Sequence, residues 1–329
     1  MNATILESAK EFDSNVLSVQ LLVRYRNIIY KAICKEYCFI LRVTSQRMRT
    51  KAQIENELRF QRYLYVNNAN VTEPLSTVNG EYVVVIEVED EQYFVSAFSF
   101  AHGKDWDERV DESPETFFEI GKALGKIHNL SKSYKPSSFR RRMWFEQQEL
   151  AEAENLFKNY NIELYNSYMN FINNLKALDT DEESFGLTHG DYLMSNYMID
   201  NDIVTVIDFD ECEYSWFAMD LAICMRCYLV GAEPEKVHEK RDLAEMIHYN
   251  FLLGYRTENT ITKDMIYDLN TYIQVRDYIE IAQLLRIVKQ GRELCDIENR
   301  LLKVDVDRVL HNAPFLEFDL SRVSKFENS

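Results

Sequence analysis

The sequence predicts an α+β chain, with strands grouped in its first hundred residues and helices after them. Three apolar runs at residues 18–23, 28–34 and 38–43 are separated by short turns, which is the pattern of an antiparallel sheet. Residues 82–100 add a hairpin with its turn at 89–91. From residue 114 onward, apolar residues recur mainly at helical spacing. We therefore expect an antiparallel sheet followed by a larger, mainly helical part.

Other elements follow from local patterns along the chain. Amphipathic spacing predicts a short helix within residues 1–20 and a longer one over residues 51–67. Ser113-Pro114 opens a helix that we expect to end at His128, because proline is favoured in the first helical turn. Gly121 and Gly125 form a G-x-x-x-G pattern in this polar-faced helix, which we interpret as close helix packing and not as a membrane contact. Further helices are expected over residues 131–185, 219–255 and 263–303.

Composition limits the classes of function. The chain has 37 basic and 54 acidic residues, a net charge of −17, which argues against a nucleic-acid partner or an anionic membrane surface. It contains no apolar run long enough for a membrane span, and no signal peptide is expected. Six scattered cysteines favour reduced thiols and a cytoplasmic location. Cys224 and Cys227 form a C-x-x-C without a second pair at zinc-site spacing, so we interpret them as buried helix cysteines.

Residues 188–210 carry the strongest indication of chemistry. A tight turn at Gly190 and a second turn at Asn201-Asp202 flank a β-branched strand at residues 203–207. Loops around this strand hold three oxygen-bearing side chains: Asp191, Asn196 and Asp208. Phosphoryl transfer needs a carboxylate that accepts the proton of the attacking hydroxyl, and oxygen ligands for Mg²⁺. The alternative is a loop of Asn and Asp residues that only cap turns.

In order and spacing these residues follow the protein-kinase pattern of an Asp, an Asn five positions later and a metal-binding Asp. His189-Gly190-Asp191 with Asn196, then Ile207-Asp208-Phe209, resembles the aminoglycoside phosphotransferase and choline kinase superfamily. The resemblance implies a bilobal, protein-kinase-like fold, with an N-lobe at residues 1–101 and a C-lobe at 102–329. It also implies ATP (or GTP), Mg²⁺ and a small hydroxylated acceptor. Asp191 would be the catalytic base, and Asn196 and Asp208 the metal ligands.

The resemblance assigns further residues to nucleotide binding. Arg42, in the third strand, would contact the phosphates and would be positioned by Glu57, with Glu55 as the rival partner and a solvated helix face as the alternative for both. The backbone of Ser99, Phe100 and Ala101 would hold the adenine edge. The turn at residues 25–27 would cover the phosphates, although it has no glycine.

Beyond Asp208, the resemblance gives Asp220 a structural role near a helix N-terminus. Asp210 replaces the glycine of Asp-Phe-Gly. It would support the metal site, lie on the surface, or contact the residues that surround the site. We expect the run Arg140–Arg142 to pair with the acidic residues 149–154.

The acceptor stays open among aminoglycoside-, choline-, homoserine- and sugar-like molecules. A set of acidic and aromatic residues would suit a cationic acceptor, although rim or packing roles fit them equally: Asp105, Trp106, Glu213, Tyr214 and Trp216. Two alternatives to a small-molecule kinase are a catalytically silent nucleotide-binding scaffold and a protein Ser/Thr kinase. Against the latter, no Ala-Pro-Glu segment follows Asp208, and the distance to Asp220 is short. The oligomeric state is left open.

Overall fold

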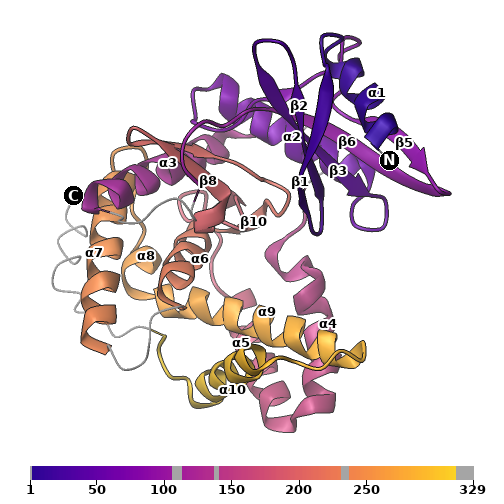
Figure 1. Cartoon of the computed structure of the whole chain (residues 1–329). Coiled ribbons are helices and arrows are strands. Elements are labelled where there is room, and N and C mark those ends of the chain that lie inside the picture. Colours follow the sequence, from indigo (N-terminus) through magenta and orange to yellow (C-terminus); the bar gives the residue numbers. More distant parts are fainter. Residues whose placement is uncertain (1, 106–112, 137–140, 231–236, 316–329) are drawn as a thin grey trace. The chain divides into compact units, whose positions relative to one another are not determined.

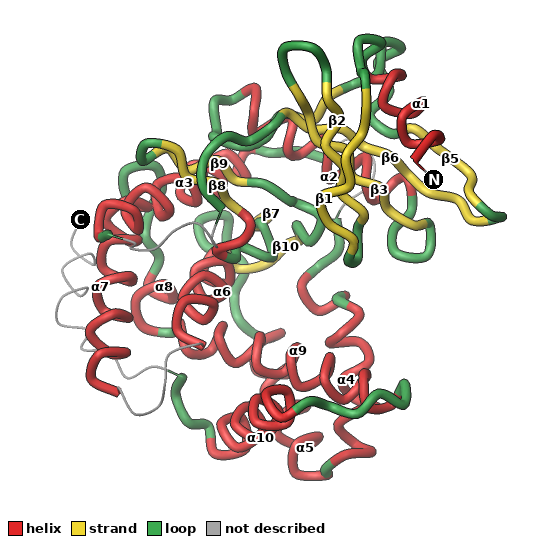
Figure 2. Tube along the Cα trace, viewed as in Figure 1, coloured by secondary structure: helices red, strands yellow, loops and turns green. Residues whose placement is uncertain are grey.

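A computed structural model describes residues 2–105, 113–136, 141–230 and 237–315. The chain forms two compact units. Strands predominate in the first unit and helices in the second, as Figure 2 shows. The α+β class expected from the sequence is confirmed, while the division at residue 101 stays a prediction. The first unit comprises Met1–Glu112, Ser133–Arg141 and Ser195–Cys212, and the second Ser113–Lys132, Arg142–Met194 and Glu213–Ser329.

The first unit is built on an antiparallel sheet in which the order is β1-β2-β3-β6-β4 and β5 also pairs with β6. The five predicted strands are present, and β4 is an addition too short to be recognised from its sequence. The bounds are β1 (Ser18–Arg24), β2 (Ile28–Ile33), β3 (Cys38–Ser45), β4 (Pro74–Leu75), β5 (Val84–Val88) and β6 (Glu91–Ser99).

Helices α1 (Asn2–Phe12) and α2 (Lys51–Val66) pack against this sheet (Figure 1). Side chains alternate along β3, so Leu41 and its neighbours two residues away pack in the core that includes α1. Ile40 packs instead with the core that includes α2. Arg42 has the parity of Ile40, so the strand directs it toward α2.

The segment between Asn196 and Asp208 forms a small hairpin in the first unit. Helix η3 (Met194–Asn196) leads into β8 (Tyr197–Asp200), which pairs with β9 (Ile203–Val206). Asn201 and Asp202 make the turn with φ of 47° and 66°, the left-handed region that Asn and Asp tolerate. The predicted turn and strand are both confirmed.

The second unit is mainly helical. The predicted helix from Ser113-Pro114 extends past His128, where its end was expected, and ends at Ser133. No glycine or proline follows His128 before Pro136, so the sequence holds no residue that would end the helix at that point. Two short strands, β7 and β10, pair with each other and were not predicted. The bounds are α3 (Pro114–Ser133), η2 (Trp144–Glu146), α4 (Gln148–Tyr160), α5 (Ile162–Lys176), β7 (Phe185–Thr188), β10 (Glu213–Trp216), α6 (Phe217–Val230), α7 (Val237–Tyr255), α8 (Lys263–Tyr267), α9 (Leu269–Lys289) and α10 (Asp296–His311).

The G-x-x-x-G pattern of α3 marks a close approach to α7. A Cβ added at Gly121 would lie 2.0 Å from the carbonyl oxygen of Phe251, and one added at Gly125 would lie 2.6 Å from that of Tyr255. Gly254 on α7 is equally restricted. The interpretation as helix packing is confirmed.

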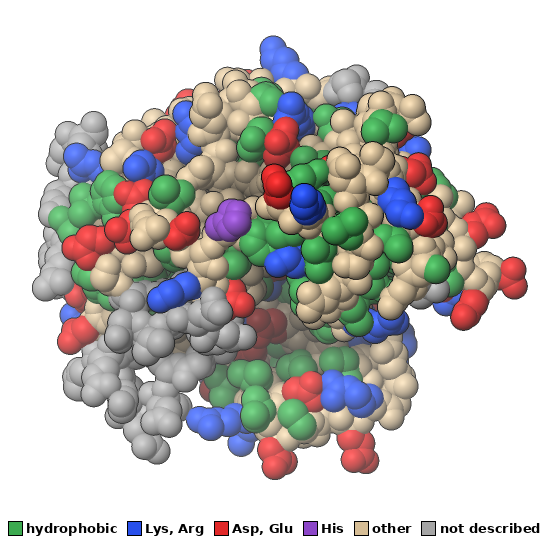
Figure 3. Space-filling view, turned by 45° about the horizontal axis from the view of Figure 1, so that its top comes forward, with side chains coloured by type: hydrophobic (Ala, Val, Ile, Leu, Met, Phe, Trp, Pro, Cys, Tyr) green, Lys and Arg blue, Asp and Glu red, His purple; other side chains and the backbone are tan. Residues whose placement is uncertain are grey.

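The surface carries charges of both signs. In Figure 3, Lys and Arg side chains are interspersed with Asp and Glu side chains over the visible face. Among the described residues, no helix combines the length and the apolar character that crossing a bilayer requires. Cys224 is buried and Cys227 half-buried on α6, and neither forms a disulfide.

Candidate active site

The His-Gly-Asp turn of the second unit is fixed by a buried carboxylate. Asp220, in the first turn of α6, is fully buried and accepts hydrogen bonds from the backbone N–H groups of His189 (2.7 Å) and Gly190 (2.8 Å). Gly190 has φ of 80°, which a glycine adopts without strain. A carboxylate at a helix N-terminus also interacts favourably with the helix dipole. This arrangement supports the structural role expected for Asp220.

His128 contacts the carboxylate of Asp220 that holds this turn. Its ring is fully buried, with Nε2 3.0 Å from the Asp220 carboxylate and Nδ1 3.0 Å from the hydroxyl of Tyr255. Burial lowers the pKa of His128, so the neutral imidazole donates to Asp220 and accepts from the tyrosine. The ring also stacks on Phe217 at 4.4 Å.

Asp191 follows this fixed turn with a side chain that is 27% exposed. Its N–H donates to Nδ1 of His189 (3.3 Å), and its carbonyl accepts from Leu193 (2.7 Å), so the backbone on both sides is held. Arg276, on α9, places a guanidinium nitrogen 3.8 Å from Oδ1 of Asp191. Sequence reasoning missed Arg276, because an arginine in the middle of a long helix has no local pattern that points to a distant carboxylate.

The predicted metal ligands lie in the first unit. The N–H of Ile207 donates to the carbonyl of Asn196 (2.9 Å), which brings the residue before Asp208 against Asn196. Asp208 has φ of 60°, and its side chain is 47% exposed. Among the described residues, no group of three or more His, Cys, Asp or Glu side chains lies close enough together to bind a metal ion by itself. An amide and an exposed carboxylate instead fit a hard cation that keeps water and phosphate oxygens as its other ligands.

Arg42 and Glu57 form the predicted ion pair, and it is buried. Nη1 and Nη2 of Arg42 donate to the two Glu57 oxygens at 2.7 and 2.9 Å, with side-chain exposures of 4% and 0%. Burial opposes the charge on Arg42, but the carboxylates of Glu57, Asp210 and Asp208 outweigh it and raise the arginine pKa. Glu55 lies instead beside Lys51 and Arg59 on the helix surface.

Asp210 is part of a charge network and not of an open metal site. Its carboxylate accepts from Nε of Arg49 (3.1 Å) and from the amide of Asn27 (3.3 Å). Burial would raise the pKa of Asp210, but Arg42, Arg49 and Arg141 outweigh it and lower the pKa to about 2. Both oxygens are therefore engaged with cations or donors of the same unit.

The expected pairing of Arg140–Arg142 with residues 149–154 is wrong for Arg141 and Arg142, the two arginines of the run that the structure describes. Arg141 donates to the backbone carbonyls of Cys212 (2.7 Å), Asp210 (2.5 Å) and Gln53 (3.1 Å), and Arg142 pairs with Glu213. Arg140 lies outside the described residues. The acidic residues Glu149 and Glu152 pair instead with Arg286 of α9.

The predicted hinge begins where β6 ends. The backbone N–H of Ser99 donates to the carbonyl oxygen of Glu73 (2.9 Å). In return, the backbone N–H of Glu73 donates to the hydroxyl oxygen of Ser99 (2.9 Å). Lys31 lies over the Phe100 ring at 4.6 Å. A contact of Ser99 with a base would therefore use its carbonyl oxygen.

Two of the proposed acceptor-pocket residues have packing roles. Glu213 is 1% exposed and accepts from Arg142 (2.8 Å) and Gln147 (2.5 Å). Trp216 is 2% exposed and packs against Trp144. Trp106 lies outside the described residues.

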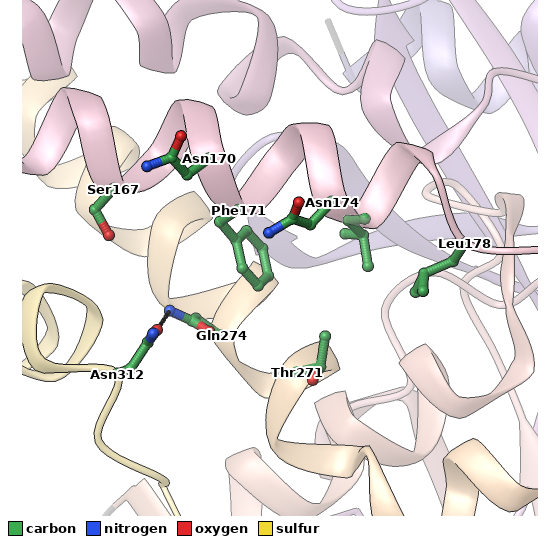
Figure 4. A pocket seen from close by; sticks show the side chains of 9 residues that line it. Ser167, Asn170, Phe171, Asn174, Leu178, Thr271, Gln274 and Asn312 are labelled. Carbon is green, nitrogen blue, oxygen red and sulfur yellow. Dashed lines mark hydrogen bonds between the residues drawn. The ribbon is translucent and has the colours of Figure 1, made fainter.

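A cavity of about 360 Å³ lies between α5, α9 and the end of α10 (Figure 4). Its lining includes Asn170, Phe171 and Gln274, and Gln274 donates to Asn312 (3.4 Å). Gln274 precedes Arg276 by two positions, and residues at that spacing point to opposite sides of a helix. The cavity therefore lies on the side of α9 away from Asp191, and it contains none of the predicted site residues.

Comparison with known proteins gives consistent results. The model of a family described as the phosphotransferase enzyme family matches residues 30–247. Amicoumacin kinase of Bacillus subtilis (strain 168) is 25% identical over 321 residues, which cover 96% of this chain and 94% of that protein. A solved amicoumacin kinase in complex with AMP-PNP, Ca²⁺ and Ami has a TM-score of 0.85 at 21% identity, covering 98% of this chain and 96% of that one. A microcompartment-associated aminopropanol kinase has a TM-score of 0.73 at 18% identity, covering 94% and 98%.

These matches confirm the expected superfamily, the protein-kinase-like fold and the enzyme class of small-molecule kinase. They do not test the individual site residues, whose roles stay predictions.

Proposed function

Because the chain belongs to the phosphotransferase enzyme family, we propose that it transfers the terminal phosphate of ATP to a hydroxyl of a small molecule in a Mg²⁺-dependent reaction. The observation that carries the proposal is the turn in which buried Asp220 fixes the backbone just before Asp191. A carboxylate held in this way and still 27% exposed is suited to accept a proton from a bound hydroxyl. Catalysis would consist mainly of positioning and of charge neutralisation.

Each predicted residue has a role in this proposal. Asp191 orients the acceptor hydroxyl and accepts its proton. Asn196 and Asp208 would hold Mg²⁺, which neutralises charge on the phosphates when it is bound. Arg42, positioned by Glu57, would contribute positive charge beside Asp208, from which its Nη1 is 3.5 Å away.

Adenine recognition is proposed for the backbone after β6. The carbonyl of Ser99 would accept from the base, with Phe100 and Ala101 completing the contact. The N–H of Ser99 is excluded as a donor here, because it is bound to Glu73.

For the acceptor, we propose a hydroxylated amine as the first class to test. One related structure is an aminopropanol kinase, and an amino alcohol is cationic at neutral pH. The net charge of −17 favours the approach of a cation over that of an anion. Amicoumacin is the second acceptor to test, because the relative that matches along 96% of this chain is an amicoumacin kinase. We place the reaction in the cytoplasm, where ATP is available.

The test is an ADP-release assay with aminopropanol, amicoumacin, choline, homoserine, sugars and aminoglycosides as acceptors. We expect Asp191→Asn and Asp208→Asn to lower kcat by at least about a hundredfold, the scale of losing general-base or metal assistance. Asp200→Asn is the matched control, because Asp200 is exposed in the same segment and should leave turnover unchanged. Normal turnover by either site variant would refute its assigned role, and nucleotide binding without transfer to any acceptor would favour a silent scaffold.

A further inference from the structure

The turn between β1 and β2 has no glycine, yet side chains fix it within the first unit. Asn27 accepts a hydrogen bond from the hydroxyl of Thr44 on β3 (2.8 Å) and donates to Oδ2 of Asp210 (3.3 Å). Thr44 is 1% exposed, so this contact reaches into the folded core. One asparagine side chain therefore connects the turn, the third strand and the segment that follows Asp208.

Arg49 anchors the same segment from the other side. Its Nε donates to Oδ1 of Asp210 (3.1 Å) and its Nη2 to Glu211 (2.8 Å), with side-chain exposures of 15%, 14% and 20% for the three residues. Ion pairs shielded from water in this way are screened little by salt. Arg49 and Asn27 therefore both anchor Asp210 within the first unit.

Arg26, at the tip of the turn, is held differently. Its Nη1 lies 3.1 Å from the same Glu211 oxygen that accepts from Arg49, and its side chain is 44% exposed. Exposed ion pairs contribute little free energy, whereas an arginine contact to phosphate is charge-assisted and can be bidentate. A triphosphate near Asp208 would compete well for Arg26, and Glu211 would keep its contact with Arg49.

We propose that Arg26 is a phosphate ligand, held by Glu211 in the free enzyme and transferred to the nucleotide phosphates on binding. It would replace the backbone amides that a glycine-rich loop supplies in protein kinases. The Glu211 carboxylate then competes with the nucleotide phosphates for the Arg26 guanidinium. This inference rests on the proposed function, because it assumes that a nucleotide binds beside Asp208.

The two partners should have opposite effects on nucleotide affinity, which a structural role alone would not produce. Arg26→Ala should raise the dissociation constant of Mg·AMP-PNP about tenfold, the usual scale of one charged hydrogen bond. Glu211→Gln should lower this constant by about two- to fivefold, because the partly exposed ion pair with Arg26 no longer has to be broken. In the double variant the gain from Glu211→Gln should disappear. Calorimetric titration of the full chain measures all four constants, and thermal unfolding confirms that each variant is folded.

We place the Arg26 contact on the two outer phosphates of the nucleotide, and AMP, which lacks both, therefore serves as the second probe. Its dissociation constant should change by less than about twofold in all variants, and Arg24→Ala, an exposed arginine of the same hairpin, should leave both constants unchanged. Equal losses for AMP and AMP-PNP in Arg26→Ala, or an affinity loss in folded Glu211→Gln, would overturn the inference while the kinase function stands. Failure of the wild-type chain to bind AMP-PNP would instead overturn the proposed function.

Discussion

The buried pair between Arg42 and Glu57 gives the most quantitative prediction. We expect Glu57→Ala to lower the free energy of unfolding by about 3–5 kcal/mol, because it leaves a buried guanidinium without its carboxylate. The side chains are 4% and 0% exposed, and two hydrogen bonds of 2.7 and 2.9 Å would be lost. Asp208 compensates only in part, since it is 3.5 Å away and 47% exposed.

Urea unfolding followed by circular dichroism measures this loss. With a slope of about 1–3 kcal/mol per molar, a loss of about 3–5 kcal/mol should lower the midpoint by about 1–5 M. The double variant Arg42→Met/Glu57→Leu should recover most of the stability, because neither charge then remains buried. Glu55→Ala is the control on the same helix, and it should change the free energy of unfolding by less than about 0.5 kcal/mol, because its ion pairs are partly exposed.

A Glu57→Ala midpoint close to that of the wild type would refute the reasoning, since it would mean that Arg42 is solvated or neutralised by another group. A double variant no more stable than Glu57→Ala would refute it as well, because the cost would then come from lost packing and not from an unpaired charge. The double variant also tests function. If it is stable but binds Mg·ATP more weakly, the role proposed for Arg42 is supported independently of folding.

Three further predictions concern the second unit. Gly121→Ala should destabilise the protein by about 1–3 kcal/mol, because the added Cβ would lie 2.0 Å from the carbonyl oxygen of Phe251. Urea unfolding measures the loss, with Asn129→Ala, at an exposed position of the same helix, as the control. Equal midpoints for the two variants would contradict the close packing. His248 is buried and donates to the carbonyl of Met265, and burial lowers its pKa to about 4, below the unfolded value of 6.5. The unfolded state thus binds the proton first, so stability is full above pH 6.5 and falls by up to about 3 kcal/mol as the pH drops toward 4. His248→Gln should flatten this dependence, and an unchanged slope between pH 6.5 and 4 would count against the assignment. Arg276→Ala should lower kcat/KM about tenfold, because the pair with Asp191 orients the proposed base. The stability should change little, since this ion pair is partly exposed. Arg276→Lys should restore part of the activity, and unchanged kinetics in the alanine variant would exclude this role.

Local patterns were sufficient for the parts of the site that depend on neighbours in the sequence. Strand alternation along β3 places Arg42 on the side of α2, and the buried positions Ile54, Leu58 and Leu64 define the inner face of that helix. Glu57 shares this face and Glu55 does not, so helical spacing agrees with the partner that the family resemblance assigned to Arg42. The turns at Gly190 and Asn201-Asp202 were likewise predictable from residue types that tolerate positive φ.

Contacts between distant residues left no such pattern. Arg49 and Asp210 are 161 positions apart, and Arg141 binds backbone carbonyls, which every residue has. The expected pairing of Arg141 and Arg142 with nearby acidic residues failed for this reason, because proximity in the sequence is a poor guide when many carboxylates are available. Strands β7 and β10, of four residues each, are also too short to show a period.

The two places where glycine was expected and is absent are explained by one network. A glycine in the turn at residues 25–27 would leave the backbone free to follow a ligand, and a glycine at position 210 would carry no charge. In this chain the side-chain amide of Asn27 donates a hydrogen bond to Asp210. The residues that stand at the two positions in place of glycine therefore contact each other. Arg49 then balances the charge that Asp210 introduces. We infer that neither position can be changed to glycine alone without loss. Asp210→Gly would remove one of the two carboxylates that pair with Arg49. The double change with Asn27→Gly would remove the contact between the two positions but also the connection between the turn and β3.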